Sequence, residues 1–171
     1  MGRVEARLQE LGIVLPDAPI IKANPALVPG VAVGNLFYCQ GAIGHTNGHF
    51  PYLGKVGDKV SVDEARISAR LCAINHLAQA KAVLGDLDRI RRVVQLLVYV
   101  NGAPGFEQAP YVSNGASDLF LEVFGPARGA MARASLSVPD LIYTAPVETI
   151  CIFEIDLDLS SVPDTDGHAH G

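Results

Sequence analysis

The segment that most constrains the fold is the run RVVQLLVYV at residues 92–100, in which apolar side chains occupy both alternating sets of positions. Side chains of a β-strand point to the two faces of its sheet in turn, so this run predicts a strand that is buried on both faces. A cover on one face alone would leave half of these apolar side chains in water. Other parts of the protein must therefore pack against both faces of this strand.

Two long helices are predicted around this strand. The first begins at Ser61, which forms a capping box with Glu64, and it ends before Gly85. The second runs from about Tyr111 to Phe124. Two helices of this length cover one face of a sheet but not both. We expect a second copy of the chain to cover the other face, because homo-oligomers commonly bury such surfaces.

The other strands are predicted from alternating apolar residues and from turn residues. They cover residues 31–33 and 36–41, a short extended piece within the loop 44–57, and the runs 131–138 and 147–157. A short amphipathic helix is expected over residues 3–11. The resulting order after this helix is β-β-(β)-α-β-α-β-β. It indicates an α+β fold with a mixed or antiparallel sheet and two long helices on one face.

The length of 171 residues suits one domain with a substantial core. We expect an N-terminal helix and linker over residues 1–25 and the folded domain over 26–157. The remaining residues, 158–171, are polar and are expected to form a disordered tail.

Charge and hydropathy limit the partners and the compartment. A net charge of −5 and scattered lysines and arginines disfavour nucleic acid as a partner. The sequence has no apolar run long enough to cross a membrane and no secretory signal pattern near residue 1, so we expect a cytoplasmic protein. Cys39, Cys72 and Cys151 are widely spaced, and we expect them to be small buried residues in a reducing compartment.

Several segments in order carry a resemblance to a known family. They are Asn35–Gly41, Leu84–Ile90, Val112–Leu119, and Ala132-Arg133 followed fifteen positions later by Glu148. In this order and spacing they resemble the YjgF/RidA (reactive-intermediate deaminase) family, in its longer branch. The resemblance implies a chorismate-mutase-like fold, a homotrimer and active sites in the clefts between subunits.

The resemblance also implies a reaction. Deaminases of this family hydrolyse small enamines or imines that carry a carboxylate, such as 2-iminopropanoate and 2-iminobutanoate, to a 2-oxo acid and ammonium. They use no metal and no organic cofactor. The corresponding catalytic residues here are Arg133, which would bind the carboxylate, and Glu148, which would exchange protons with water or ammonia. The substrate-binding residues would be Gln40, Gly41, Asn114 and Ser135. Two positions depart from the family pattern, since Gln40 and Ala134 stand where serine is common.

A second arginine competes for the carboxylate. Arg128 lies in a Pro-Ala-Arg phrase that also occurs in the family, but it is twenty positions from Glu148. It is expected on a loop, whereas Arg133 is expected on a strand, and a rigid clamp favours the strand. The sequence favours Arg133 and leaves Arg128 open.

The last two strands are expected to form a hairpin. If its loop is centred on residues 142 and 143, Arg133 lies opposite Ile152 and Glu148 lies opposite Ser137. This offset of four residues is about 13 Å, too far for one small substrate to span easily. We therefore expect the two residues to meet across a subunit boundary, or Glu148 to act through water.

Other readings remain open from the sequence. The same fold could be a trimer that binds a small metabolite without catalysis, or an endoribonuclease, which the charge and the few aromatic residues disfavour. His45 and His49 lack a nearby carboxylate or thiolate, so loop packing is favoured over a metal site. A catalytic role for Cys39 is disfavoured because no base is apparent beside it.

Overall fold

The computed structural model describes residues 2–17, 24 and 26–156. The polar tail predicted for residues 158–171 lies outside the described residues, as does part of the predicted linker. In the described part, no helix is both long enough and apolar enough to cross a membrane.

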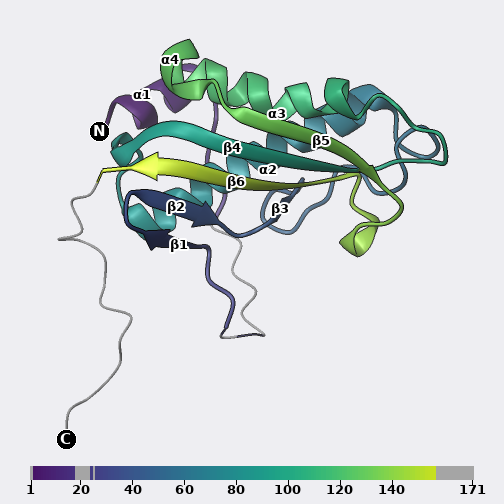
Figure 1. Ribbon diagram of the computed structural model, residues 1–171, viewed down its shortest axis with the longest axis horizontal. Helices are drawn as coiled ribbons and strands as arrows, with labels where there is room; N and C mark the ends of the chain where they lie inside the picture. Colours follow the sequence, from purple (N-terminus) through teal and green to yellow (C-terminus); the bar gives the residue numbers. More distant parts are fainter. Residues whose placement is uncertain (1, 18–23, 25, 157–171) are drawn as a thin grey trace, which may run out of the picture.

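Six strands form one mixed sheet (Figure 1). They are β1 (Gly30–Val33), β2 (Leu36–Cys39), β3 (Ala42–Ile43), β4 (Ile90–Asn101), β5 (Ala132–Val138) and β6 (Val147–Ile155). The order across the sheet is β1-β2-β6-β4-β5, and the short β3 also pairs with β6. Strand β5 runs parallel to β4, whereas the other pairs are antiparallel.

Two long helices pack together on one face of the sheet, and Figure 1 shows α2 passing behind β4 and β6. They are α2 (Val62–Leu84) and α3 (Ala109–Phe124). The predicted capping box opens α2, since the Ser61 hydroxyl accepts from the Glu64 N–H at 3.3 Å and Glu64 accepts from the Ser61 N–H at 2.8 Å. The helix ends at Gly85, whose φ of 75° suits glycine.

The shorter helical elements join or flank these layers. They are α1 (Arg3–Glu10), η1 (Leu87–Arg89), α4 (Pro126–Gly129) and η2 (Ile142–Thr144). This arrangement confirms the predicted α+β fold with a mixed sheet and two long helices on one face. One detail was wrong: the third strand lies at Ala42–Ile43, just before the Gly-rich loop in which it was expected.

The core lies between the helices and the sheet. The odd-numbered residues of β6 point into it, as the alternation predicted; they are Val147, Thr149, Cys151, Phe153 and Ile155. The helix-facing side chains of β4, among them Leu96 and Val98, are fully buried as well. The helices therefore cover β4 and β6 on this face within one chain, whereas Arg133 and Ser137 of the edge strand β5 stay exposed.

The other face of the sheet is open. Among the described residues, no helix or strand lies over it. Its apolar side chains come from five strands and include Val31, Tyr38, Leu97, Leu136, Ile150 and Ile152. Val31 is 51% exposed, Leu136 43% and Ile150 36%. An apolar surface that extends over five strands is unusual for a monomer. The open face agrees with the expectation that a second layer of protein packs against this side of β4. The second copy of the chain and the number of subunits stay predictions.

The predicted C-terminal hairpin was wrong. Strand β4 lies between β5 and β6, so Arg133 is not opposite Ile152 and Glu148 is not opposite Ser137. The chain leaves β5 at the sheet edge and returns on the far side of β4. A parallel pair such as β4 and β5 needs a crossover between its strands, and α3 with α4 supplies it here.

Candidate functional site

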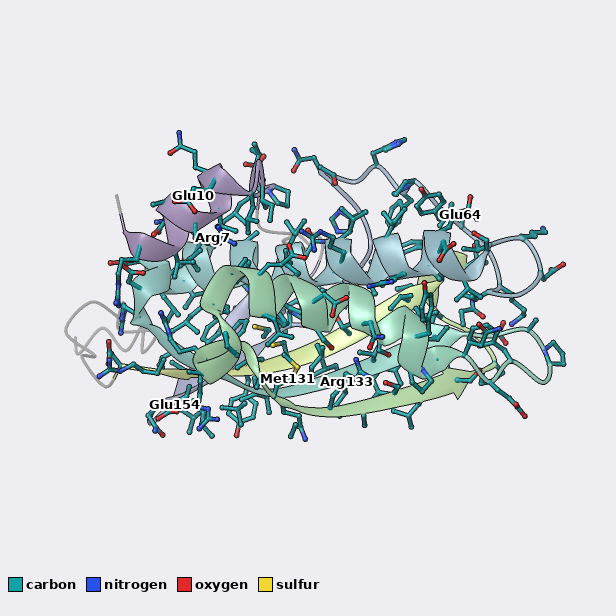
Figure 2. All side chains as sticks on the ribbon, turned by 90° about the horizontal axis from the view of Figure 1, so that it is seen from above. Arg7, Glu10, Glu64, Met131, Arg133 and Glu154 are labelled. Atoms are coloured by element: carbon teal, nitrogen blue, oxygen red, sulfur yellow. The ribbon has the colours of Figure 1, made fainter. Side chains whose placement is uncertain are left out.

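The guanidinium of Arg133 is held by helix α3. Arg133 lies on edge strand β5 beside this helix (Figure 2). Its Nη1 donates to Asn114 Oδ1 at 2.8 Å and to Ser117 Oγ at 2.9 Å, and its Nη2 donates to the Pro110 carbonyl at 3.4 Å. Among the described residues, these contacts use three of the five N–H donors of a guanidinium. Donors on Nε and Nη2 are left for a ligand, and the side chain is exposed to one.

The sequence placed Asn114 and Ser135 in the same site as Arg133. The structure brings Asn114 into direct contact with Arg133, and it puts Ser135 two residues along the same face of β5. This face carries the polar half of the strand, and it turns toward the helices because Arg133 pairs with the buried Leu96. Sequence reasoning missed Ser117, although it lies three residues after Asn114, one helical turn along.

A second group of predicted residues gathers around Glu148. Its Oε1 lies so close to Gly41 that a Cβ at that position would be 2.8 Å away, and a real side chain there would displace the carboxylate. Gln40 and Gly41 line one cavity with Glu148, of about 260 Å³. Desolvation raises the pKa of the Glu148 carboxyl. A carboxylate with a raised pKa is a stronger proton acceptor than an ordinary glutamate, which suits a general base.

The two groups lie on opposite faces of the sheet. Arg133 pairs with Leu96, whose side chain points into the core, whereas Glu148 pairs with Tyr99 and points to the open face. One small substrate therefore cannot touch Arg133 and Glu148 of the same chain. The expected separation holds, but its cause is the face on which each residue lies and not an offset along a hairpin.

Arg128 is tied into the fold. It lies in the short helix α4 and not on a loop, so this expectation was wrong. Its Nε donates to the Arg91 carbonyl at 3.1 Å, its Nη2 donates to the Ile90 carbonyl, and its guanidinium stacks over the Phe124 ring at 5.4 Å. Desolvation lowers the pKa of this guanidinium. These contacts give Arg128 a structural role at the start of β4.

Three residues with rings line the same cavity as Glu148. His45 and Phe50 have ring centroids 5.3 Å apart, and Phe50 and Tyr143 have centroids 5.9 Å apart. The sequence assigned His45 to loop packing, and the structure places it on the cavity wall. Phe50 and Tyr143 were not singled out, because they lie about ninety residues apart and only the fold brings them together.

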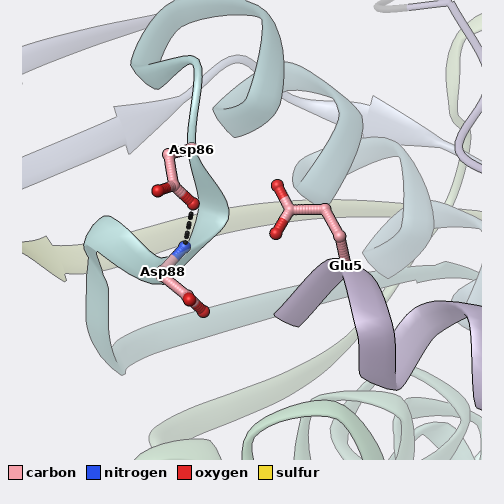
Figure 3. A group of neighbouring side chains, drawn as sticks. All are labelled: Glu5, Asp86 and Asp88. Carbon is pink, nitrogen blue, oxygen red and sulfur yellow. Dashed lines mark hydrogen bonds between the residues drawn. The ribbon is translucent and has the colours of Figure 1, made fainter. Parts of the chain in front are cut away.

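Three carboxylates, Glu5, Asp86 and Asp88, lie together near the N-terminus (Figure 3). Asp88 accepts from the first two backbone N–H groups of α1 at 2.7 and 2.9 Å, and Asp86 accepts from the Asp88 N–H at 2.9 Å. Lys81 donates to Glu5 at 2.6 Å. These partners explain the cluster as the anchor of α1, because carboxylates at a helix N-terminus satisfy its unpaired donors.

The cysteines are buried, as predicted. Cys39 follows the alternation of β2 into the core, where it contacts His76 and Cys151, and so it does not line the cavity. His76 itself donates to or accepts from Gln79 and Thr149 at 3.0 and 2.8 Å. Sequence reasoning found no base near Cys39 because His76 reaches it from α2.

Comparisons with known proteins agree with this fold. The family model described as "YjgF/chorismate mutase-like, putative endoribonuclease" matches residues 5–156. Protein TCP17 of Trypanosoma cruzi is 40% identical over 91% of this chain and 96% of its own length. The crystal structure of Atu1372 from Agrobacterium tumefaciens, a protein of unknown function, is 41% identical, has a TM-score of 0.81 and aligns over 90% of this chain and 93% of its own.

A third relative extends the likeness. A Shewanella oneidensis protein, also described as a putative endoribonuclease, is 28% identical with a TM-score of 0.83, over 89% of this chain and 99% of its own. The match of the family model covers nearly the whole described chain, and two relatives are about 40% identical over nearly their full length. The chain therefore belongs to the YjgF/chorismate mutase-like family.

Proposed function

We propose that the protein hydrolyses small imines and enamines that carry a carboxylate. In the imine form the reaction is RC(=NH2+)COO− + H2O → RC(=O)COO− + NH4+. Water adds to the imine carbon, the C–N bond breaks, and ammonium leaves. The observation that carries the proposal is the preorganised guanidinium of Arg133, held at 2.8 and 2.9 Å by Asn114 and Ser117 with donors left over.

Arg133 would bind the substrate carboxylate. A guanidinium binds a planar carboxylate through two N–H groups and stays charged at any relevant pH. Because Asn114 and Ser117 already fix its orientation, little side-chain freedom is lost when the ligand binds. Asn114 and Ser135 would complete the polar surroundings of the carboxylate.

Glu148 would move the protons. Its raised pKa suits a group that takes a proton from the attacking water and returns it to the departing nitrogen. Gly41 lets this carboxylate lie against the backbone, and Gln40 lies in the same cavity, where its amide could hold the water or the imine nitrogen.

The complete site would need a second copy of the chain. Arg133 and Glu148 lie on opposite faces, so a cleft between subunits is the simplest place where a guanidinium and a glutamate could meet around one substrate. The open apolar face supports this assembly, which we propose is a homotrimer, as the family resemblance implies. The expected mass is three times the 18.1 kDa of the chain, and sedimentation would show it. A mass of one chain would contradict the proposal.

A metabolite-binding trimer without catalysis is the second candidate. Gln40 lines the cavity at a position where the deaminases resembled here usually have serine, and its bulk and amide favour binding over turnover. Both candidates require Arg133 to bind a small carboxylate, and only the hydrolase requires Glu148. Endoribonuclease activity, which the family description mentions, is disfavoured by the net charge of −5.

The test is an imine assay with matched variants. An amino-acid oxidase generates 2-iminopropionate from alanine, and its loss is followed above the spontaneous rate. The wild type should accelerate this loss. Glu148→Gln should lower kcat at least about 100-fold, the lower end of general acid–base contributions, and should still bind 2-oxobutyrate. The control Glu154→Gln changes the same residue type on the same face of β6 and should stay within twofold. Wild-type protein that binds 2-oxobutyrate without accelerating the loss would refute the hydrolase and leave the binding candidate.

A further inference from the structure

The cavity beside Glu148 has both polar and apolar lining. Gln40 and Glu148 contribute amide and carboxylate groups to its lining, and the side chains of Ile43, Phe50, Ile142 and Tyr143 contribute apolar surface. Its volume is about 260 Å³. One water molecule takes up about 30 Å³ in the liquid, and a methyl group is of similar size. The methyl of an alanine-derived imine would therefore leave most of this cavity unfilled.

Three rings in the lining form a row. His45, Phe50 and Tyr143 follow one another with centroid distances of 5.3 and 5.9 Å and interplanar angles of 51° and 45°. These separations lie in the range in which aromatic rings attract one another. Tyr143 is 65% exposed and Ile142 is 54% exposed, so the row stays open to an incoming group. Such a row offers a flat apolar surface to a ligand.

The backbone that presents Tyr143 is strained. Tyr143 and Thr144 have φ values of 56° and 54°, in the left-handed region that residues with a Cβ avoid. The turn is held by hydrogen bonds, in which the Thr144 carbonyl accepts from the Gly54 N–H at 2.8 Å and the Thr144 N–H donates to Leu141 at 3.1 Å. Strain of this kind persists where the surroundings enforce it, and it is concentrated at ligand sites.

His45 is fixed as a neutral ring. The Gly48 N–H donates to its Nδ1 at 3.2 Å, so the ring proton of the neutral form is on Nε2. Asn75 donates to the His45 carbonyl at 3.0 Å and holds the loop against α2. Desolvation lowers the pKa of this imidazole, so it stays uncharged at neutral pH. The wall thus offers an apolar ring face and one N–H donor, with no charge that would attract a second carboxylate.

We infer that this cavity receives the side chain of the imino acid and that it favours large apolar side chains, above all aromatic ones. The inference rests on the imine hydrolysis proposed above and names its substrate class. The carboxylate would be bound at Arg133, the imine carbon would lie near Glu148, and the side chain would extend along Phe50 and Tyr143. The amino-acid precursor would then resemble phenylalanine or leucine more than alanine.

The experiment compares imines that differ only in the side chain. An amino-acid oxidase generates them from alanine, leucine and phenylalanine, and kcat/KM is measured for each. The wild type should favour the phenylalanine imine over the alanine imine at least tenfold, with leucine between them. Tyr143→Ala and Phe50→Ala should bring this ratio close to one. Tyr143→Phe should keep the ratio.

Leu53→Ala is the matched control, because Leu53 is an exposed apolar loop residue, 47% accessible, that does not line the cavity. Its ratio should equal that of the wild type. Equal or faster turnover of the alanine imine by the wild type would overturn the inference and leave the hydrolase proposal standing. Loss of the assembly in Tyr143→Ala would also overturn it, since the ring would then belong to a subunit contact.

Product binding separates the two proposals. Phenylpyruvate and pyruvate carry the same carboxylate and differ in the side chain, and calorimetry measures their affinity without any turnover. Phenylpyruvate should bind at least tenfold more tightly to the wild type. If this holds and no imine is hydrolysed, the hydrolase proposal fails while the side-chain preference of the cavity is retained. If the two bind equally, the side-chain inference fails whatever the imine assay gives.

Discussion

The two arginines should respond to truncation in opposite ways. Arg133→Ala removes the proposed carboxylate clamp but only a few internal contacts. Arg128→Ala removes bonds to two backbone carbonyls and a ring contact but no part of the proposed site. We predict that Arg133→Ala loses ligand binding with a nearly unchanged melting temperature. Arg128→Ala should lose stability and keep binding.

The magnitudes follow from the contacts. A hydrogen bond to a charged group is worth about 1.5–3 kcal/mol, so each bond lost to the carboxylate should weaken binding roughly 10- to 150-fold. The Asn114 and Ser117 contacts of the exposed Arg133 side chain should cost about 1 kcal/mol, because Ser117 keeps its hydrogen bond to the Ser113 carbonyl. For Arg128, solvent reaches both carbonyl bonds, so each should be worth only about 0.5–1 kcal/mol, and with a cation–π contact of about 0.5 kcal/mol the total cost should be about 2 kcal/mol. This corresponds to about 4–8 °C for a chain of this size.

The assay needs two measurements on each variant. Calorimetry with 2-oxobutyrate reports binding, and circular dichroism reports thermal unfolding. Arg133→Lys is the third variant: it keeps the charge without the planar fork and should bind nearly as poorly as Arg133→Ala. Arg3→Ala, whose side chain is 80% exposed, is the control that should change neither. If Arg128→Ala lost binding and Arg133→Ala kept it, the assignment of the clamp would be refuted.

Three further predictions follow from the open face and the Glu148 cavity. Gly41→Ala should abolish turnover with the fold intact on circular dichroism, because a Cβ 2.8 Å from Glu148 Oε1 displaces that carboxylate. Ile150→Asp with Ile152→Asp should give monomeric or insoluble protein in sedimentation, whereas an unchanged assembly would show that this face is not an interface. Burial raises the pKa of Glu148, so its stabilising contribution is present at acid pH and lost as pH rises through the folded pKa. Glu148→Gln should therefore raise the melting temperature at pH 7, and the gain should vanish below about pH 4, where the free side chain is protonated as well.

Local sequence signals were enough to predict most of the fold. The capping box at Ser61 and the stop at Gly85 set the ends of α2 because both act within a few residues. The alternation of β6 set which side chains enter the core, since one face is buried and the other is not. The two-sided apolar pattern of β4 correctly indicated that one face of the sheet lacks a cover among the residues that the structure describes.

Strand order could not be predicted in the same way. Nothing in the sequence of β5 distinguishes a strand that pairs with β6 from one that pairs with β4, because both pairings accept the same alternation. The short connection through η2 suggested a hairpin, yet the chain passes over the end of β4 and continues beyond it. The aromatic lining of the cavity could not be predicted for a related reason. Phe50 and Tyr143 meet only because the connection through η2 lies beside the Gly-rich loop.

The central position of β4 links the stability of the protein to its site. Because Arg133 pairs with Leu96 of β4 and Glu148 pairs with Tyr99, the two residues lie on opposite faces, and one chain alone holds only half of the proposed site on each. The same strand has apolar side chains on both faces, and only one face is covered by α2 and α3. Any copy that covers the open face must therefore pack against the surface from which Glu148 projects. Burial of that surface and completion of the site would then be one event, and mutations that weaken the assembly should reduce activity even where they touch no ligand.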